Sequence, residues 1–96
     1  MSKIKELPEL ERPREKLIRF GADKLSNEEL LAIIIATGYK GKNAKDIAYE
    51  ILSSTNGLLG LTSLSYKSLL SFKGISKVKA LTLSSIFELY KRISPQ

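Results

Sequence analysis

Residues 65–90, SYKSLLSFKGISKVKALTLSSIFELY, decide the predicted fold, because they contain a short helix, a tight turn and a longer helix. Gly74 stands where the short helix must stop, and glycine adopts the left-handed backbone of a sharp reversal at little steric cost. Ile75 is apolar within the turn, which indicates that it fills the gap between the two helices. Ser76 stands at the N-cap position of the longer helix. The stretch therefore predicts a helical hairpin whose free backbone N–H groups open onto a helix N-terminus.

Lysines flank this turn, and the combination predicts a site for the phosphate groups of nucleic acid. Backbone N–H groups from Gly74 to Lys77 would donate to a phosphodiester, and lysine side chains would add positive charge. Such contacts hold the nucleic-acid backbone and carry little sequence information. A purely structural turn is the alternative, because short helical connections also use glycine stops and serine caps. The candidate DNA-binding residues of the hairpin are Lys73, Gly74, Ile75, Ser76, Lys77 and Lys79.

The charge distribution favours a polyanionic partner. The chain has a net charge of +6, and no Asp or Glu occurs between Ile51 and Phe87. An excess of one sign around a hairpin is typical of nucleic-acid binding. A solvated, lysine-rich surface is the alternative interpretation.

Composition excludes several function classes. The 96 residues form one domain with a modest core, and they include no cysteine and no histidine. The sequence therefore lacks disulfides, thiolate chemistry and the commonest general base, and it indicates no metal or cofactor site. No acid pair, nucleophile–base pair or phosphate-binding loop of the Walker type stands out, so we expect no enzymatic activity. No apolar run is long enough for a membrane span and no signal peptide begins the chain, so a cytoplasmic location is the default.

The first half of the chain predicts two helices after a flexible N-terminal arm, residues 1–11. A helix over residues 14–20 follows Pro13 and ends at Gly21. Ser26 and Glu29 form a capping box ahead of the apolar run 30–36, which predicts a buried helix that ends near Gly38. We expect that helix to be the centre of the core, so that Ile34→Asp would unfold the domain.

A second glycine turn follows, and its residues Tyr39, Lys40, Gly41 and Lys42 are candidates for a second phosphate contact or for base stacking. An exposed flexible loop is the alternative. Asn43 would cap a helix over residues 44–54, and the apolar connector 58–64 allows at most one helical turn. The last helix spans about residues 77–93, and its apolar set includes Val78, Ala80, Leu81, Leu83, Ile86, Phe87, Leu89, Tyr90 and Ile93.

Helix, glycine turn and helix occur twice, at residues 30–52 and 69–90, which suggests a pseudo-two-fold pair. The predicted fold is an all-α, five-helix bundle that forms one paired helix-hairpin-helix domain over residues 12–94.

The chain resembles the N-terminal domain of the RadC family, the bacterial proteins labelled as DNA repair proteins. The resemblance depends on Arg12-Pro13-Arg14-Glu15-Lys16-Leu17, on Leu25-Ser26 with Glu29-Leu30-Leu31, and on Thr37-Gly38 with Lys40-Gly41-Lys42. It covers about residues 8–93. The hairpin of that family typically reads Gly-Ile-Gly, whereas this chain has Gly74-Ile75-Ser76, which keeps the cap and loses one glycine.

The resemblance implies a paired helix-hairpin-helix domain similar to domain 2 of RuvA. It also implies a second, C-terminal domain in the full-length protein, similar to metal-dependent JAB/MPN isopeptidases with a His-x-His and Asp zinc motif. This chain ends at Gln96 and contains no histidine, so that domain is expected to be absent from it.

Two functions follow from these observations. The first is DNA binding without sequence preference, to the backbone of duplex or branched DNA, as the N-terminal module of a RadC-like repair protein. It predicts a steep salt dependence and loss of binding when Lys77 and Lys79 become Glu. The second is a protein-interaction or dimerisation module, similar to a sterile-alpha-motif bundle, that docks the C-terminal domain or a second copy. It predicts tolerance of those changes.

Overall fold

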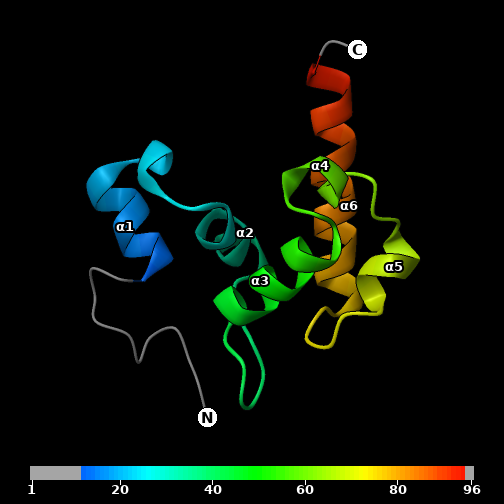
Figure 1. The fold of residues 1–96 in the computed structure, drawn as a ribbon, viewed down its shortest axis with the longest axis horizontal. Coiled ribbons are helices and arrows are strands. Elements are labelled where there is room, and N and C mark those ends of the chain that lie inside the picture. The colour runs from blue at the N-terminus through cyan, green and yellow to red at the C-terminus, as the bar shows by residue number, and fades with distance from the viewer. Residues whose placement is uncertain (1–11, 95–96) are drawn as a thin grey trace. The chain divides into compact units, whose positions relative to one another are not determined.

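The computed structural model describes residues 12–94, which fold into α-helices and connecting turns and contain no β-strand (Figure 1). The elements are α1 Pro13–Phe20, the 3₁₀ turn η3 Ala22–Lys24, α2 Asn27–Ile35, α3 Ala44–Ser54, α4 Leu58–Leu61, α5 Tyr66–Leu70 and α6 Lys77–Ile93. The all-α class is confirmed. α4 is the single helical turn allowed in the connector, and counting it gives six helices among the described residues. The predicted N-terminal arm, residues 1–11, lies outside them.

The chain divides into two compact units, Met1–Glu50 and Ile51–Gln96, and the division falls inside α3. Each unit contains one of the two glycine turns. The single domain over residues 12–94 and its pseudo-two-fold hairpin pair therefore stay predictions.

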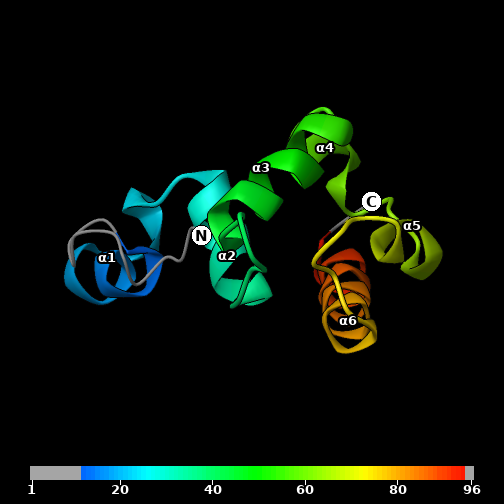
Figure 2. The ribbon, with the colours of Figure 1, turned by 90° about the horizontal axis from the view of Figure 1, so that it is seen from below.

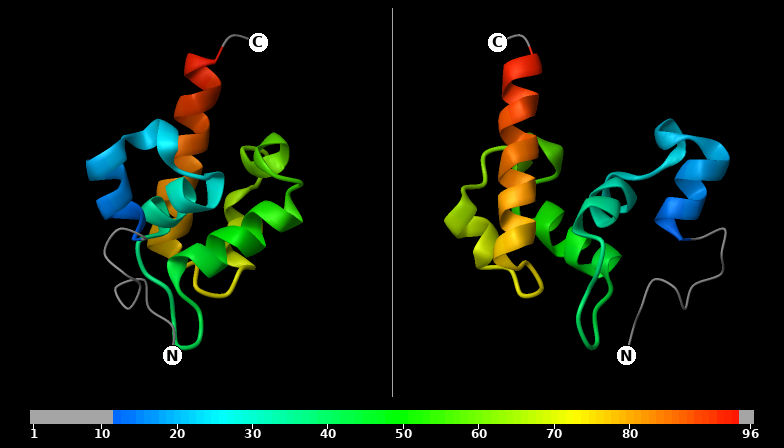
Figure 3. Two further views of the ribbon diagram at one scale, coloured as in Figure 1. Left: turned by 60° about the vertical axis from the view of Figure 1, so that its left-hand side comes forward. Right: turned by 180° about the vertical axis from the view of Figure 1, so that it is seen from behind.

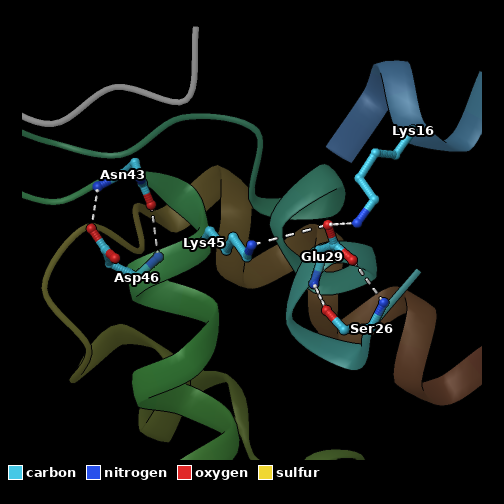
Figure 4. A network of polar contacts seen from close by, with 6 residues as sticks. All are labelled: Lys16, Ser26, Glu29, Asn43, Lys45 and Asp46. Atoms are coloured by element: carbon cyan, nitrogen blue, oxygen red, sulfur yellow. Dashed lines mark hydrogen bonds and ion pairs between the residues drawn. The ribbon is translucent and has the colours of Figure 1, made fainter. Parts of the chain in front are cut away.

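Polar caps position α2 and α3 in the first unit. The Ser26 hydroxyl accepts the backbone N–H of Glu29 at 3.2 Å, and the Glu29 carboxylate accepts the Ser26 N–H at 2.9 Å, which is the predicted capping box. At α3, Asn43 and Asp46 exchange the same pair of bonds, at 2.8 and 3.0 Å. Figure 4 shows both caps. The caps fix where each helix begins, because they satisfy N–H groups that have no acceptor inside the helix.

The burial of α2 differs from the prediction. Leu31, Ala32 and Ile35 are buried, but Ile34 is 37% exposed. The buried positions recur at i, i+1 and i+4, so they lie on one side of the helix, and Ile34 falls outside that sector. The helix contributes to the core as expected, but the prediction that Ile34 is buried, so that Ile34→Asp would unfold the domain by burying a carboxylate, was wrong.

The end of α2 also differs from the prediction. The helix ends at Ile35, and Ala36 adopts φ of 73° and ψ of −53°, while the Thr37 N–H donates to the Ile35 carbonyl at 2.9 Å. This three-residue γ-turn ends the helix at Ile35, three residues before Gly38. Gly38 does not end the helix, but the turn requires glycine at this position. A Cβ atom there would lie 2.1 Å from the Lys42 carbonyl oxygen.

In the second unit, α5 lies alongside the N-terminal part of α6, as all the ribbon views show (Figures 1–3). The Ser65 hydroxyl caps α5 by accepting the Ser68 N–H at 3.1 Å, as predicted. The buried apolar residues of this unit are Ile51, Leu52, Leu61, Leu69, Ile75, Ala80, Leu83 and Phe87. Ile75, in the turn between α5 and α6, is one of them, so the turn contributes a side chain to the core of this unit.

Candidate nucleic-acid interface

The turn between α5 and α6 has the geometry that the sequence predicts. Gly74 adopts φ of 96°, in the left-handed region that favours glycine. The Ile75 N–H donates to the Phe72 carbonyl at 3.1 Å, and the Ile75 side chain is only 6% exposed. Ile75 therefore anchors the turn from inside. The exposed backbone on either side of it has a fixed conformation, which a binding site for an anion requires.

Ser76 and Lys79 link the turn to the first turn of α6. The Ser76 hydroxyl accepts the backbone N–H of Lys79 at 3.3 Å, so Ser76 is the N-cap. The Lys79 ammonium donates to the Gly74 carbonyl at 3.3 Å. Burial lowers the pKa of Lys79 because it disfavours the charged form. Lys79 is therefore half-buried, and its ammonium stabilises the turn. The sequence predicted for it only a contribution of positive charge.

Several backbone N–H groups at this corner are available to a ligand. No hydrogen bond between residues 12–94 uses the N–H of Gly74, Ser76, Lys77 or Val78. They belong to the turn and to the first turn of a helix of 17 residues. Such N–H groups and the helix dipole together favour an anion. Lys77 is exposed beside them. Sequence reasoning did not include the N–H of Val78, although the N-cap Ser76 predicts it, because the first positions of a helix lack an internal acceptor.

Charge in the second unit is strongly one-sided. Residues 51–96 contain six Lys and Arg and one acid, Glu88, whereas residues 1–50 contain ten Lys and Arg and nine acids. Glu88 pairs with Arg92 at 3.0 Å near the far end of α6. The first turn of α6 contains no acidic residue. The potential around the Gly74 corner is therefore set by lysines alone within this unit.

The second predicted site, the turn from Tyr39 to Lys42, has a different character. Tyr39 and Lys42 exchange backbone hydrogen bonds, both at 2.9 Å, around Lys40 and Gly41. Gly41 has φ of 92°, as the third position of a type II turn requires. The Lys42 ammonium forms an ion pair with Glu50, and the hydrogen bond to that carboxylate is the main cause that raises the pKa of Lys42. Lys42 is thus already paired with an anion of its own unit, while Lys40 is exposed.

The structure brings together Lys73, Gly74, Ile75, Ser76, Lys77 and Lys79 in one turn of the second unit, and Tyr39, Lys40, Gly41 and Lys42 in one turn of the first. Each set is a local cluster within its own unit.

The remaining polar network lies in the first unit and is structural. Glu29 is buried, and its carboxylate accepts from the Lys16 ammonium at 2.7 Å, with Lys45 at 4.0 Å (Figure 4). The network links α1, α2 and α3 through one carboxylate. Sequence analysis identified the cap made by Glu29 but missed Lys16 as its partner, because a contact across 13 residues leaves no periodic signal.

Two further features bear on function. No cluster of three or more His, Cys, Asp or Glu side chains suited to a metal ion occurs within residues 12–94. In the same part of the chain, every helix is too short or too polar to cross a bilayer.

Comparison with known proteins places the chain in a family. Residues 4–81 match the family described as UPF0758 N-terminal. A UPF0758 protein of Clostridium perfringens is 50% identical over 90 residues, which cover 94% of this chain and 40% of that protein. A UPF0758 protein of Clostridium beijerinckii is 47% identical, with coverage of 94% and 39%, and one of Desulfitobacterium hafniense is 43% identical, with coverage of 94% and 40%.

No solved structure matches the chain. The chain spans 40% or slightly less of the length of these relatives. The resemblance to RadC is confirmed, because UPF0758 is the RadC-like family. The chain belongs to the UPF0758 family and corresponds to its N-terminal domain.

Proposed function

We propose that this chain binds the phosphate backbone of duplex or branched DNA, without sequence preference, through the corner between α5 and α6. The observation that carries the proposal is the set of unbonded N–H groups at Gly74, Ser76, Lys77 and Val78, which open at the N-terminus of α6 beside exposed Lys77. Backbone N–H groups, a helix N-terminus and a lysine are the donors that phosphate oxygens accept.

The rigidity of the corner supports the proposal. Ile75 is buried and Gly74 holds a left-handed conformation, so the N–H groups are oriented before a ligand arrives. A preorganised site loses less conformational entropy on binding than a flexible loop does. Lys79 adds to this order, because its ammonium holds the Gly74 carbonyl.

The charge distribution favours a polymer over a small anion. Residues 51–87 contain four lysines and no acid, and all four lysines lie between residues 67 and 79, so positive charge is concentrated on α5, the turn and the start of α6. A polyanion gains from each cation along such a surface, because every neutralised phosphate releases counterions. The turn from Tyr39 to Lys42 would add little charge, since Lys42 pairs with Glu50.

A role in DNA repair, a cytoplasmic location and a C-terminal JAB/MPN domain in the full-length protein belong to the same proposal, by extension from the RadC-like family. The chain itself would act as a binding module without catalysis.

Fluorescence anisotropy of labelled duplex and four-way-junction DNA tests the proposal. We expect binding at low salt, with log affinity falling against log salt by about 0.9 per phosphate contact. Lys77→Gln should lower that slope by about 1, which corresponds to a roughly eightfold loss of affinity at 0.1 M salt and almost none at 1 M. The variant keeps the helix, because Gln is a good helix former.

Lys91→Gln is the matched control. It removes the same charge from the same helix, about 21 Å further along the axis, and Lys91 is likewise exposed. We expect a markedly smaller change in slope than for Lys77→Gln. Equal losses in the two variants would mean general attraction to a basic protein rather than a site at the corner. Absence of binding to either DNA at 20 mM salt would refute DNA binding altogether.

A further inference from the structure

The C-terminal half of α6 presents a second apolar face that the structure leaves uncovered. Ile86, Leu89, Tyr90 and Ile93 recur at i, i+3, i+4 and i+7, the spacing of one face of an amphipathic helix. Leu89 is 58%, Tyr90 53% and Ile93 80% exposed, and Ile86 is half-buried. We call these four residues the terminal stripe.

The terminal stripe is distinct from the core side of α6. The core side consists of Ala80, Leu83 and Phe87, and no residue of α6 after Phe87 is buried among residues 12–94. Successive residues of an α-helix are turned by about 100°, which places the stripe in the sector next to the core side. The charged residues Glu88, Lys91 and Arg92 lie on the side of the helix opposite to the stripe. The helix therefore remains amphipathic beyond the point where its own unit covers it.

An amphipathic pattern without a covering element indicates an interaction surface. Exposed apolar residues scattered singly need no explanation, but a contiguous stripe with a polar flank marks a docking face. The charged flank includes an ion pair between Glu88 and Arg92. Both partners of that pair are exposed, so the charged flank faces solvent and the terminal stripe itself contains no charged residue.

The occupant is indicated by the place of the stripe in the chain. α6 is the last helix among the described residues, and its first residues lie within the match to the UPF0758 N-terminal family over residues 4–81. The 90 residues aligned with the Clostridium perfringens relative make up only 40% of that protein. In such longer proteins we expect the polypeptide that follows the matched region to leave from the end of the helix that corresponds to α6. A segment tethered there has an effective concentration in the millimolar range, which favours docking on the nearest apolar surface.

We infer that the terminal stripe is the docking surface for the segment that follows the N-terminal domain in longer UPF0758 proteins. This surface is separate from the DNA-binding corner, because Lys77 and Ile93 lie at opposite ends of α6, about 24 Å apart along its axis. One helix thus carries a basic end and an apolar end, and both surfaces can be occupied at the same time.

Hydrogen exchange tests the inference. The 96-residue chain is compared with a chimera in which it replaces the matched residues of the Clostridium perfringens protein. We expect amides 88–93 to exchange at least tenfold more slowly in the chimera. Leu89→Gln with Ile93→Gln should return them to the rate of the free chain. Leu59→Gln is the matched control, because Leu59 is an apolar residue of the same unit, 87% exposed and outside the stripe.

A second measurement does not depend on the folding of the chimera. In the free 96-residue chain, Leu89→Gln with Ile93→Gln should leave the helical circular dichroism and the melting temperature nearly unchanged, since Leu89 and Ile93 are exposed and no described residue of the second unit covers them. A large loss of stability would show that the stripe belongs to the core of the chain itself, which would overturn the inference. Protection of amides 88–93 that grows with the concentration of the free chain would identify a second copy as the occupant, and would also overturn it. Equal exchange rates of amides 88–93 in the free chain and in the chimera would also overturn the inference.

Discussion

Glu29 allows a quantitative test of the polar network that links α1, α2 and α3. Its carboxylate accepts the Lys16 ammonium at 2.7 Å and the Ser26 N–H at 2.9 Å, and the residue is 4% exposed. Glu29→Gln keeps an oxygen that can accept the Ser26 N–H, so the cap survives. The variant loses the charge that attracts Lys16. The difference between the two proteins therefore reports on the ion pairs of Glu29, chiefly the one with Lys16 at 2.7 Å and to a smaller extent the one with Lys45 at 4.0 Å.

The expected magnitude follows from the burial of the pair. A hydrogen bond between charged groups contributes about 1.5–3 kcal/mol. The Lys16 side chain is 29% exposed, so water screens part of the attraction. We expect Glu29→Gln to lower the free energy of unfolding by about 1–2 kcal/mol at pH 7. A loss of 1 kcal/mol corresponds to a fall of about 4–8 °C in the melting temperature of a domain of this size.

The same pair predicts a pH dependence. Burial alone raises the pKa of Glu29, but the hydrogen bonds from Lys16 and Ser26 and the charge of Lys16 outweigh it, so the pKa lies below its ordinary value of 4.5. A folded pKa below the unfolded one stabilises the protein at every pH above the unfolded value. That contribution is lost as the pH falls from about 4.5 through the folded pKa. The penalty of Glu29→Gln should therefore disappear in acid.

Urea unfolding followed by circular dichroism at pH 7 and at pH 2.5 measures both effects. Glu28→Gln is the control, because it removes the same charge from the same helical turn while Glu28 has no ion pair among the described residues. We expect at most a few tenths of a kcal/mol for the control, from the helix dipole. Equal penalties for the two variants at pH 7, or a penalty for Glu29→Gln that does not shrink at all between pH 7 and pH 2.5, would refute the role given to the Lys16 pair.

The remaining predictions concern backbone positions, each checked by thermal unfolding. Gly38→Ala should destabilise by about 2–3 kcal/mol, because the new Cβ would lie 2.1 Å from the Lys42 carbonyl oxygen; an unchanged melting temperature would show that the turn is not so close. Ala36→Gly should stabilise by about 0.5–1 kcal/mol, since glycine relieves the positive φ of 73°. Gly74→Ala should destabilise by about 1–2 kcal/mol, because alanine is strained at a φ of 96°. The same variant should weaken DNA binding in fluorescence anisotropy. Unaltered binding would contradict the proposal that the Gly74 corner is preorganised.

Local chemistry explains why the helix starts could be predicted. Ser26, Asn43, Ser65 and Ser76 all cap helices by accepting an N–H three residues ahead. A cap depends only on residues next to it in sequence, so the sequence contains all the information that the prediction needs. The conformation of the Gly74 corner could be predicted for the same reason, because a positive φ and an N-cap both depend on residues next to each other in sequence.

Non-local contacts explain what could not be predicted. α2 ends at a γ-turn on Ala36, a residue that carries no signal for a positive φ. The pairing of Lys42 with Glu50 joins a turn to a helix eight residues later, so the sequence analysis counted Lys42 as available for phosphate. Ile34 and Ile35 are equally apolar, yet Ile34 is 37% and Ile35 only 1% exposed. Which isoleucine faces the core depends on the angle of the helix, and a continuous apolar run does not specify that angle.

α6 shows most clearly how one apolar pattern can serve two purposes. The sequence analysis assigned its apolar residues to a single set, but the structure buries Ala80, Leu83 and Phe87 and leaves Leu89 and Ile93 exposed. A single core face at 3.6 residues per turn would not include all of these positions, because their helical angles span far more than a 100° sector. The excess of apolar residues over one face was therefore already a sign of a second surface. Its position at the end of α6 away from the lysine corner would allow this 17-residue helix to carry the proposed DNA-binding corner and the proposed docking surface at the same time.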